Sequence, residues 1–209
     1  MIAILAALAA VASQPVQRSP SPADLFHPAP GCTVDLDAML KLPPYDFDQT
    51  DKGWRSIAKP ECNITAADLI GTYRRANWGK LTNNDVAISY WHEGQSRAMA
   101  GQTEQAIPLL LAGVNPAATG LSTNTSFGLA NAEYALATVA FLQRDLPALK
   151  AARARLFAIP EPPEYTEFFK TVPVAARVAA KWPPNLNVVD GLIACFGKSY
   201  GEAYGCRPE

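Results

Sequence analysis

Apolar and small residues recur at steps of three and four along residues 84–115, the most regular pattern in the chain. This spacing predicts two amphipathic helices, and the short break between them makes the helices antiparallel neighbours. We expect Asn84 to be the N-cap of the first helix and Gly101 to end it. Thr103 is expected to cap the second helix, which ends before Pro116. The small and apolar positions of the two helices are Ala87, Tyr90, Trp91, Gly94 and Ala98, followed by Ala106, Ile107, Leu110, Gly113 and Val114.

The order of residues in this hairpin resembles a tetratricopeptide (TPR) repeat. That family has a small residue in its first helix, then a glycine, an alanine and an apolar residue at set distances along the chain. The positions that match in order are Gly94, Gly101, Ala106 and Leu110, with Tyr90 in the aromatic place before the first glycine. The hairpin departs from the family at three places. Glu93 replaces the usual leucine, Arg97 replaces the usual tyrosine, and Pro108 lies inside the second helix, where it removes one hydrogen bond.

Further stretches of the chain have helical spacing. Thr65 and Asp68 fit a capping box, and Asp145 is a good N-cap. Residues 188–196 fit a buried strand or a short helix, and we favour a helix because no partner strand is visible elsewhere. Pro173 is expected to kink the helix that contains it. The further helices are therefore expected over residues 35–40, 65–77, 127–143, 146–158, 164–181 and 188–196.

The fold class predicted from these elements is all-α, built from antiparallel helical hairpins. Residues 127–158 resemble a second, degenerate repeat, in which Ala137 stands in the place of Gly94 and Arg144 replaces the turn glycine. The resemblance implies a TPR-like right-handed repeat core over residues 84–158, followed by a disulfide-tied C-terminal extension. Residues 32–60 are poorly patterned, but we expect Trp54 and Ile57 to pack against the core.

The N-terminal residues predict three segments. Residues 1–12 are almost wholly apolar, too short to span a bilayer, and end in an A-x-A cleavage site, so we interpret them as a secretory signal peptide. The alternative is an N-terminal core helix. Residues 13–31 hold five prolines and predict a linker. Residues 32–209 form the single predicted α-helical domain, and the expected location is periplasmic or secreted.

Four cysteines in an exported chain indicate two disulfides. Three pairings are possible, and the simplest joins Cys32 to Cys62 and Cys195 to Cys206, because each bond then closes a terminal segment onto the domain. Without export, the alternative is four free buried thiols.

Composition excludes some classes of partner. A hydrophobic content of 49% with 18% charged residues is typical of a globular chain. The net charge of −1 argues against nucleic acid and offers no polybasic patch for anionic lipid. We expect no stable membrane insertion after signal cleavage.

The short motifs do not assemble an active site. Residues 197–201 spell G-x-S-x-G, but the motif lies at the end of the chain and no histidine follows Ser199, so we interpret the glycines as turn residues. His92 and Glu93 begin like a zinc motif, but Ser96 stands where the second histidine belongs. We therefore predict no catalytic residues, no metal and no cofactor.

The resemblance to TPR proteins implies a groove lined by the first helix of each hairpin. The groove residues expected here are Trp91, Gln95, Asn131, Tyr134 and Thr138, with Ile88, Met99 and Phe141 at neighbouring positions of the same faces. Aromatic and amide groups suit peptide binding. The alternative is that Trp91, Tyr134 and Phe141 belong to the core, which we expect for at least two of them.

The leading hypothesis is an exported, non-catalytic scaffold of the cell envelope that binds a protein or a peptide. The alternative is a small exported hydrolase or enzyme inhibitor that acts through the loop at residues 116–126 or at residues 195–206. A third possibility is a stability module with no partner of its own.

Overall fold

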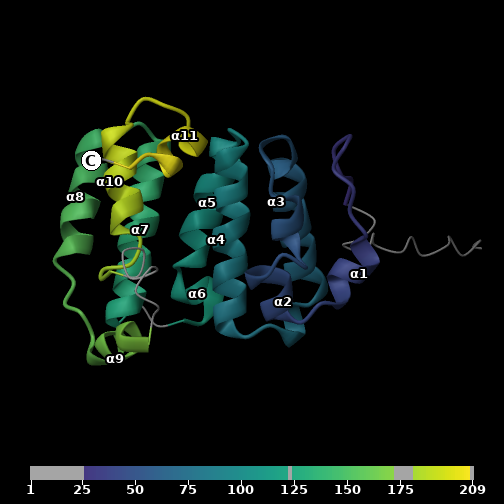
Figure 1. Ribbon diagram of the computed structural model, residues 1–209, viewed down its shortest axis with the longest axis horizontal. Helices are drawn as coiled ribbons and strands as arrows, with labels where there is room; N and C mark the ends of the chain where they lie inside the picture. Colours follow the sequence, from purple (N-terminus) through teal and green to yellow (C-terminus); the bar gives the residue numbers. More distant parts are fainter. Residues whose placement is uncertain (1–25, 122–123, 172–180, 208–209) are drawn as a thin grey trace, which may run out of the picture.

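The computed structural model describes residues 26–121, 124–171 and 181–207, and within these ranges the protein is all-α, without a β-strand (Figure 1). This confirms the predicted fold class. The α-helices are α1 (Leu36–Lys41), α2 (Pro44–Gln49), α3 (Asn63–Ala76), α4 (Asn83–Met99), α5 (Thr103–Gly113), α6 (Pro116–Thr119), α7 (Ser126–Leu142), α8 (Leu146–Phe157), α9 (Pro163–Thr171), α10 (Leu186–Ala194) and α11 (Tyr200–Gly205). Short 3₁₀ turns lie at Trp54–Ile57, Pro60–Cys62 and Trp78–Lys80.

Helices α3, α4, α5, α7 and α8 stand side by side, with α1 and α2 at one end of the row (Figure 1). The most extensive pairing is between α4 and α5, as the hairpin pattern predicts. Gly101 adopts φ +77 just after α4, the left-handed conformation that favours glycine at this position. A Cβ on Gly94 would lie 2.8 Å from Leu110 Cγ, so the glycine is what lets α5 approach α4 this closely.

Three predicted helix starts are wrong. Thr82, not Asn84, caps α4, and its side chain forms a capping box with Asp85. Thr103 is the first residue of α5 rather than its cap. Thr65 does not open α3: it is buried within the helix, where its hydroxyl accepts a hydrogen bond from the Ala29 N–H at 2.9 Å. Helix α3 starts earlier because the 3₁₀ turn that ends at disulfide-bonded Cys62 leads directly into it. The N-cap at Asp145 is confirmed.

The N-terminal elements form a separate small core against α3. Phe47 of α2 stacks on Tyr73 of α3, with ring centroids 3.7 Å apart and planes 6° from parallel. Trp54 is buried in the same cluster and Ile57 packs against it, as predicted. Helix α2 was not predicted, because Pro43 and Pro44 look like a break in the sequence, whereas Pro44 is its first residue.

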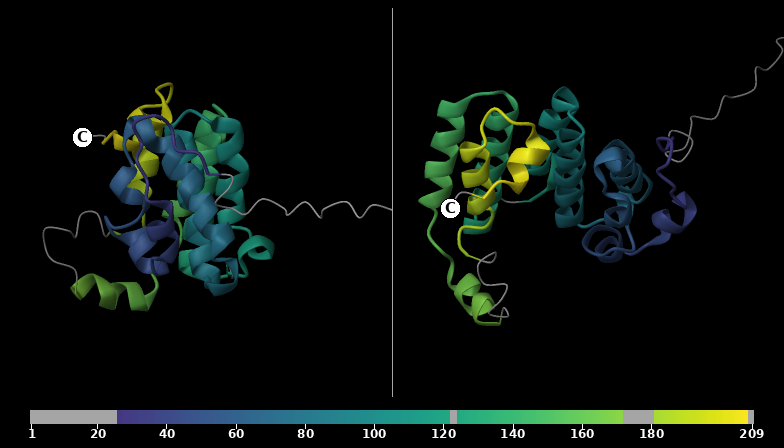
Figure 2. Two further views of the ribbon diagram at one scale, coloured as in Figure 1. Left: turned by 90° about the vertical axis from the view of Figure 1, so that its right-hand side faces the viewer. Right: turned by 45° about the horizontal axis from the view of Figure 1, so that its top comes forward.

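The C-terminal helices cover the other end of the row. Helix α10, predicted over residues 188–196, packs against α7 and α8, and α11 contacts α4 (Figure 2). Both predicted disulfides are present, Cys32–Cys62 and Cys195–Cys206. A Cβ on Gly191 would lie 2.2 Å from the Cys206 carbonyl oxygen, so the disulfide-closed tail lies directly on α10. Helix α11 was not predicted.

The region after α8 projects from the row at its lower edge (Figure 1). Helix α9 covers the first half of the predicted helix 164–181, and the kink at Pro173 lies outside the described residues. Residues 1–25, which contain the predicted signal peptide, also lie outside them. None of the helices searched in the described part of the chain has the length and apolar character needed to cross a bilayer.

Candidate functional site

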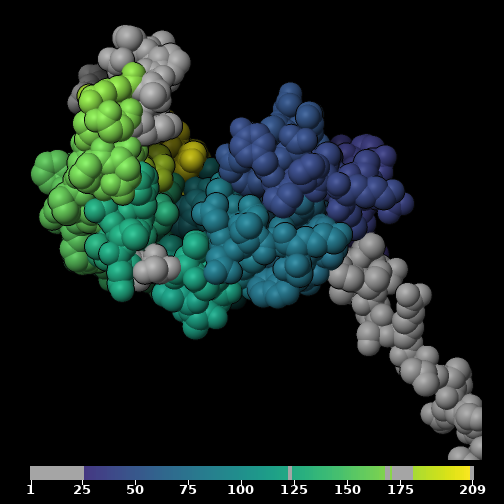
Figure 3. All heavy atoms as spheres, turned by 90° about the horizontal axis from the view of Figure 1, so that it is seen from below, coloured from purple at the N-terminus to yellow at the C-terminus, as the bar shows by residue number. Residues whose placement is uncertain are grey.

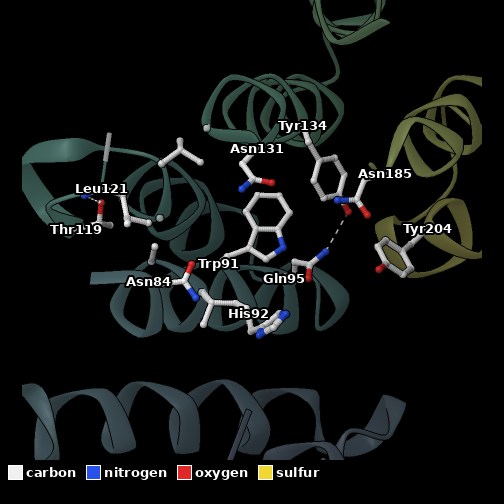
Figure 4. Close-up of a pocket in the computed structure, with 15 residues that line it drawn as sticks. Asn84, Trp91, His92, Gln95, Thr119, Leu121, Asn131, Tyr134, Asn185 and Tyr204 are labelled. Atoms are coloured by element: carbon white, nitrogen blue, oxygen red, sulfur yellow. Dashed lines mark hydrogen bonds between the residues drawn. The ribbon is translucent and has the colours of Figure 1, made fainter. Parts of the chain in front are cut away.

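A pocket of about 320 Å³ opens between α4 and α7. Seen from below, the surface is hollowed between the end of the molecule that carries α9 and the end that carries α2, with C-terminal residues visible in the depth (Figure 3). Trp91 stands in the centre of the pocket, with Asn131 and Tyr134 pointing toward it from α7 (Figure 4). The polar and aromatic lining residues are Asn84, Trp91, His92, Gln95, Thr119, Asn131, Tyr134, Asn185 and Tyr204.

Helix α4 supplies one wall because its lining residues recur at helical spacing. Asn84, Ile88, Trp91 and Gln95 follow one another at steps of four, three and four, which places them on one face. The end of α5 lies close against α4 beside the pocket. A Cβ on Gly113, the last residue of α5, would lie only 3.1 Å from the Ala87 carbonyl oxygen of α4.

Gln95 connects three elements at the inner end of the pocket. Its Nε2 donates to the Tyr134 hydroxyl of α7 at 3.3 Å (Figure 4). The same Nε2 donates to the Tyr200 hydroxyl of α11, also at 3.3 Å. Burial raises the pKa of the Tyr134 phenol, and the neighbouring Tyr200 and Tyr204 add to the effect. Burial likewise raises the pKa of the Tyr200 phenol. These phenols are therefore neutral hydroxyl groups at physiological pH.

Several hydrogen-bonding groups of the lining have no partner among the described residues. Within the described residues, no hydrogen bond engages the side-chain amides of Asn84, Asn131 and Asn185 or the indole N–H of Trp91. The Trp91 ring packs at 49° to Tyr134 with ring centroids 4.7 Å apart. The pocket thus offers an aromatic surface surrounded by free amides.

The lining is also without permanent charge. None of its described residues is Lys, Arg, Asp or Glu. His92 lies at the edge, where its Nδ1 donates to Asp48 Oδ1 at 2.6 Å. Burial alone would raise the pKa of Asp48, but the hydrogen bond and charge of His92, with a hydrogen bond from Trp54, outweigh burial and lower it. Asp48 lies outside the lining, but its partner His92 is part of it, so this edge of the pocket is tied to the N-terminal elements.

The structure brings four of the five predicted groove residues together: Trp91, Gln95, Asn131 and Tyr134 all line the pocket. The fifth, Thr138, does not. It is fully buried and its hydroxyl donates to the Tyr134 carbonyl oxygen at 3.0 Å. Thr138 lies one turn beyond Tyr134, where Tyr200 of α11 covers the helix face.

The three further positions predicted on the same helix faces are also divided between the pocket and the core. Ile88 lines the pocket, whereas Phe141 is a core residue and Met99 packs against the core. Tyr134 is itself 4% exposed, so it is both a core residue and part of the pocket wall.

Sequence reasoning missed five polar or aromatic members of the lining, and the apolar Leu121 as well. Asn84 and His92 could have been found by extending the helical face of α4 to adjacent positions. The others have no local signal, because they come from separate segments that only the fold brings to α4. These residues are Thr119, Leu121, Asn185 and Tyr204. Thr119 and Leu121 belong to the loop predicted over residues 116–126, which begins as helix α6.

The G-x-S-x-G segment has a structural role. Ser199 is the N-cap of α11 and forms a capping box with Glu202, so its hydroxyl is engaged by its own helix. The segment leads from α10 into α11 and not from a strand into a helix. Among the described residues, no group of three or more His, Cys, Asp or Glu side chains is placed to hold a metal ion.

Comparison with protein-family models, with curated proteins and with solved structures finds no match. Fold and site therefore define the class of protein: over the described residues it is an all-α chain of helical hairpins with two disulfides. Between two hairpins lies a pocket whose described lining holds no Lys, Arg, Asp or Glu. Disulfides persist in oxidising environments, so the two bonds fit a protein that works outside the cytoplasm.

Proposed function

We propose that the protein is an exported, non-catalytic scaffold of the cell envelope that binds a polypeptide segment in the pocket between α4 and α7. In TPR-like proteins the first helix of each hairpin lines the groove, and α4 and α7 are the first helices of the two hairpins here. Both helices contribute to the same pocket.

The observation that carries this proposal is the lining of the pocket. Trp91 presents an aromatic surface, and the amides of Asn84, Asn131 and Asn185 are free to donate and to accept. A peptide group also has one donor and one acceptor, so amides of this kind can pair with a backbone. A volume of about 320 Å³ suits a short segment and not a folded surface.

Export is supported by two independent features. Residues 1–12 have the composition of a signal peptide. The two disulfides in the domain would be unusual in a reducing cytoplasm. The test is fractionation of cells that produce the full chain, combined with thiol alkylation. A processed, fully oxidised protein in the envelope or medium is expected, and a cytoplasmic protein with free thiols would contradict export.

Binding is tested by partner capture from an envelope extract. The pocket variant combines Asn84→Ala and Asn131→Ala, because both side chains are exposed and neither holds another element in place. Gln95 is left unchanged, since it connects α7 to α11. The matched control is Asn187→Ala, an exposed asparagine of α10 outside the pocket.

We expect the wild-type protein and the control to capture the same polypeptide and the pocket variant to lose it, with all three unfolding at similar temperatures. A partner retained equally by the pocket variant would contradict the proposed site.

A further inference from the structure

We infer that the segment bound in the pocket is an internal, uncharged stretch of an extended polypeptide, and not a chain terminus or a charged side chain. This inference rests on the proposed function, because it assumes that the ligand is a polypeptide. It adds which part of a polypeptide the pocket recognises.

The described lining of the pocket supplies no counter-charge for a charged ligand. A free terminus or a charged side chain brings a full charge, and placing that charge in a pocket without a partner costs free energy. The described lining contains no Lys, Arg, Asp or Glu. Tyr134 does not supply a negative charge either, because burial keeps its phenol protonated.

The polar and charged groups that surround the lining residue His92 contact one another. His92 donates to Asp48, and Arg55 donates to the Asp48 carbonyl oxygen. The Arg55 guanidinium also lies 4.4 Å from the centre of the Trp54 ring. Arg55 Nη2 also lies 3.5 Å from Nε2 of the lining residue His92, so these groups form the contact between α4 and the N-terminal elements at one edge of the pocket.

The lining does supply neutral hydrogen-bonding groups that are free within the described residues. Asn84, Asn131 and Asn185 lie on three sides of Trp91 (Figure 4). Each primary amide offers two donor hydrogens and one acceptor oxygen, and none is engaged within the described part of the chain. An internal stretch presents neutral N–H and C=O groups along its length, whereas a carboxylate only accepts and an ammonium only donates.

An aromatic surface lies at the centre of the pocket. Trp91 and Tyr134 pack against each other and leave a half-buried indole between the amides. An apolar side chain of the ligand can cover the indole while the flanking peptide groups meet the amides. The expected ligand therefore has an uncharged apolar residue in the middle of an extended segment.

The experiment titrates ¹⁵N-labelled full-length protein with synthetic pentapeptide pools and follows the Trp91 indole N–H and the asparagine side-chain amides by NMR. The first pool has an apolar central residue, uncharged neighbours, an acetylated N-terminus and an amidated C-terminus. The second pool has the same sequences with a free C-terminal carboxylate. The third has both ends blocked and a central Lys or Asp.

We expect the blocked neutral pool to bind at least about tenfold more tightly than the other two. Asn131→Ala should weaken this binding, and the control Asn187→Ala should leave it unchanged. Equal or tighter binding of the free carboxylate or of the charged pool would overturn the inference while leaving the peptide-binding function in place.

Absence of any shift at pocket signals with all three pools would refute the proposed function itself. A neutral disaccharide, N,N′-diacetylchitobiose, serves as a further arm, because hydroxyl and acetamido groups also pair with amides. Pocket shifts with this disaccharide and none with the peptides would reject both the proposed function and the inference, and would assign the site to glycans.

Discussion

Glu93 of α4 and Arg74 of α3 form a buried ion pair, with Glu93 Oε2 2.5 Å from an Arg74 terminal nitrogen and both side chains about 95% buried. Arg97 lies 2.9 Å from the other oxygen of Glu93 and 2.8 Å from Asp68 of α3. Glu93 and Arg97 are the two positions of α4 at which the hairpin departs from the TPR pattern. The structure shows that they form one network that attaches α3 to α4.

Replacing one member of this pair should be costly. Glu93→Leu leaves the Arg74 guanidinium buried without its partner, and we expect the free energy of unfolding to fall by about 3–5 kcal/mol. In the double variant Glu93→Leu/Arg74→Met no charge is left uncompensated at this contact, so most of the loss should be recovered. Urea unfolding of both variants measures the effect, and a double variant less stable than the single one would contradict it.

The close approach of α4 and α5 predicts that Gly94 cannot be enlarged. A methyl group at this position would lie 2.8 Å from Leu110 Cγ. Gly94→Ala is therefore expected to lower the free energy of unfolding by about 1–3 kcal/mol. Gly79→Ala is the control, because a Cβ there meets no atom within 4 Å. Equal stability of the two variants in thermal unfolding would show that the hairpin relaxes around the added methyl.

The hydrogen bond between His92 and the Asp48 carboxylate predicts acid sensitivity. The pKa of Asp48 is lowered in the folded protein from its usual value of 3.8. Its stabilising contribution is therefore complete above that value and is lost as the pH falls through the lower, folded-state pKa. Asp48→Asn should reduce stability by about 1–3 kcal/mol near neutral pH and the difference from wild type should shrink below about pH 4. Urea unfolding across the acid range measures it, and a difference independent of pH would contradict this prediction.

The disulfide between Cys195 and Cys206 is expected to support the pocket as well as the fold. It closes the tail that carries Tyr204, a lining residue. The double variant Cys195→Ser/Cys206→Ser should lose about 2–4 kcal/mol of stability and should bind the pocket ligand more weakly. The double variant Cys32→Ser/Cys62→Ser is the control, because its bond lies outside the pocket. Loss of stability without loss of affinity in the C-terminal variant would show that Tyr204 is held by packing alone.

Some interpretations were right because they depend on neighbours in sequence. The face of α4 carries Trp91 and Gln95 at a spacing set by helix geometry, and Gly101 ends the helix through its own backbone freedom. Two predicted helix caps were wrong. Thr65 and Asn84 are good capping residues in isolation, but each lies inside a helix that starts earlier. The start of α4 is set by the capping box of Thr82 with Asp85, and the start of α3 by the turn that ends at disulfide-bonded Cys62.

By itself, the sequence determined the all-α class, the central hairpin and four of the residues that meet in the pocket, and it left three cysteine pairings open, of which the simplest is the one present. The helical features depend on periodicity and on short-range chain geometry, which act over a few residues. Only the tertiary structure decided that Thr138 is buried while Asn185 and Tyr204 reach the pocket, and that Glu93 finds Arg74. Such contacts join segments far apart in the chain, and their free energy depends on packing that no local pattern encodes.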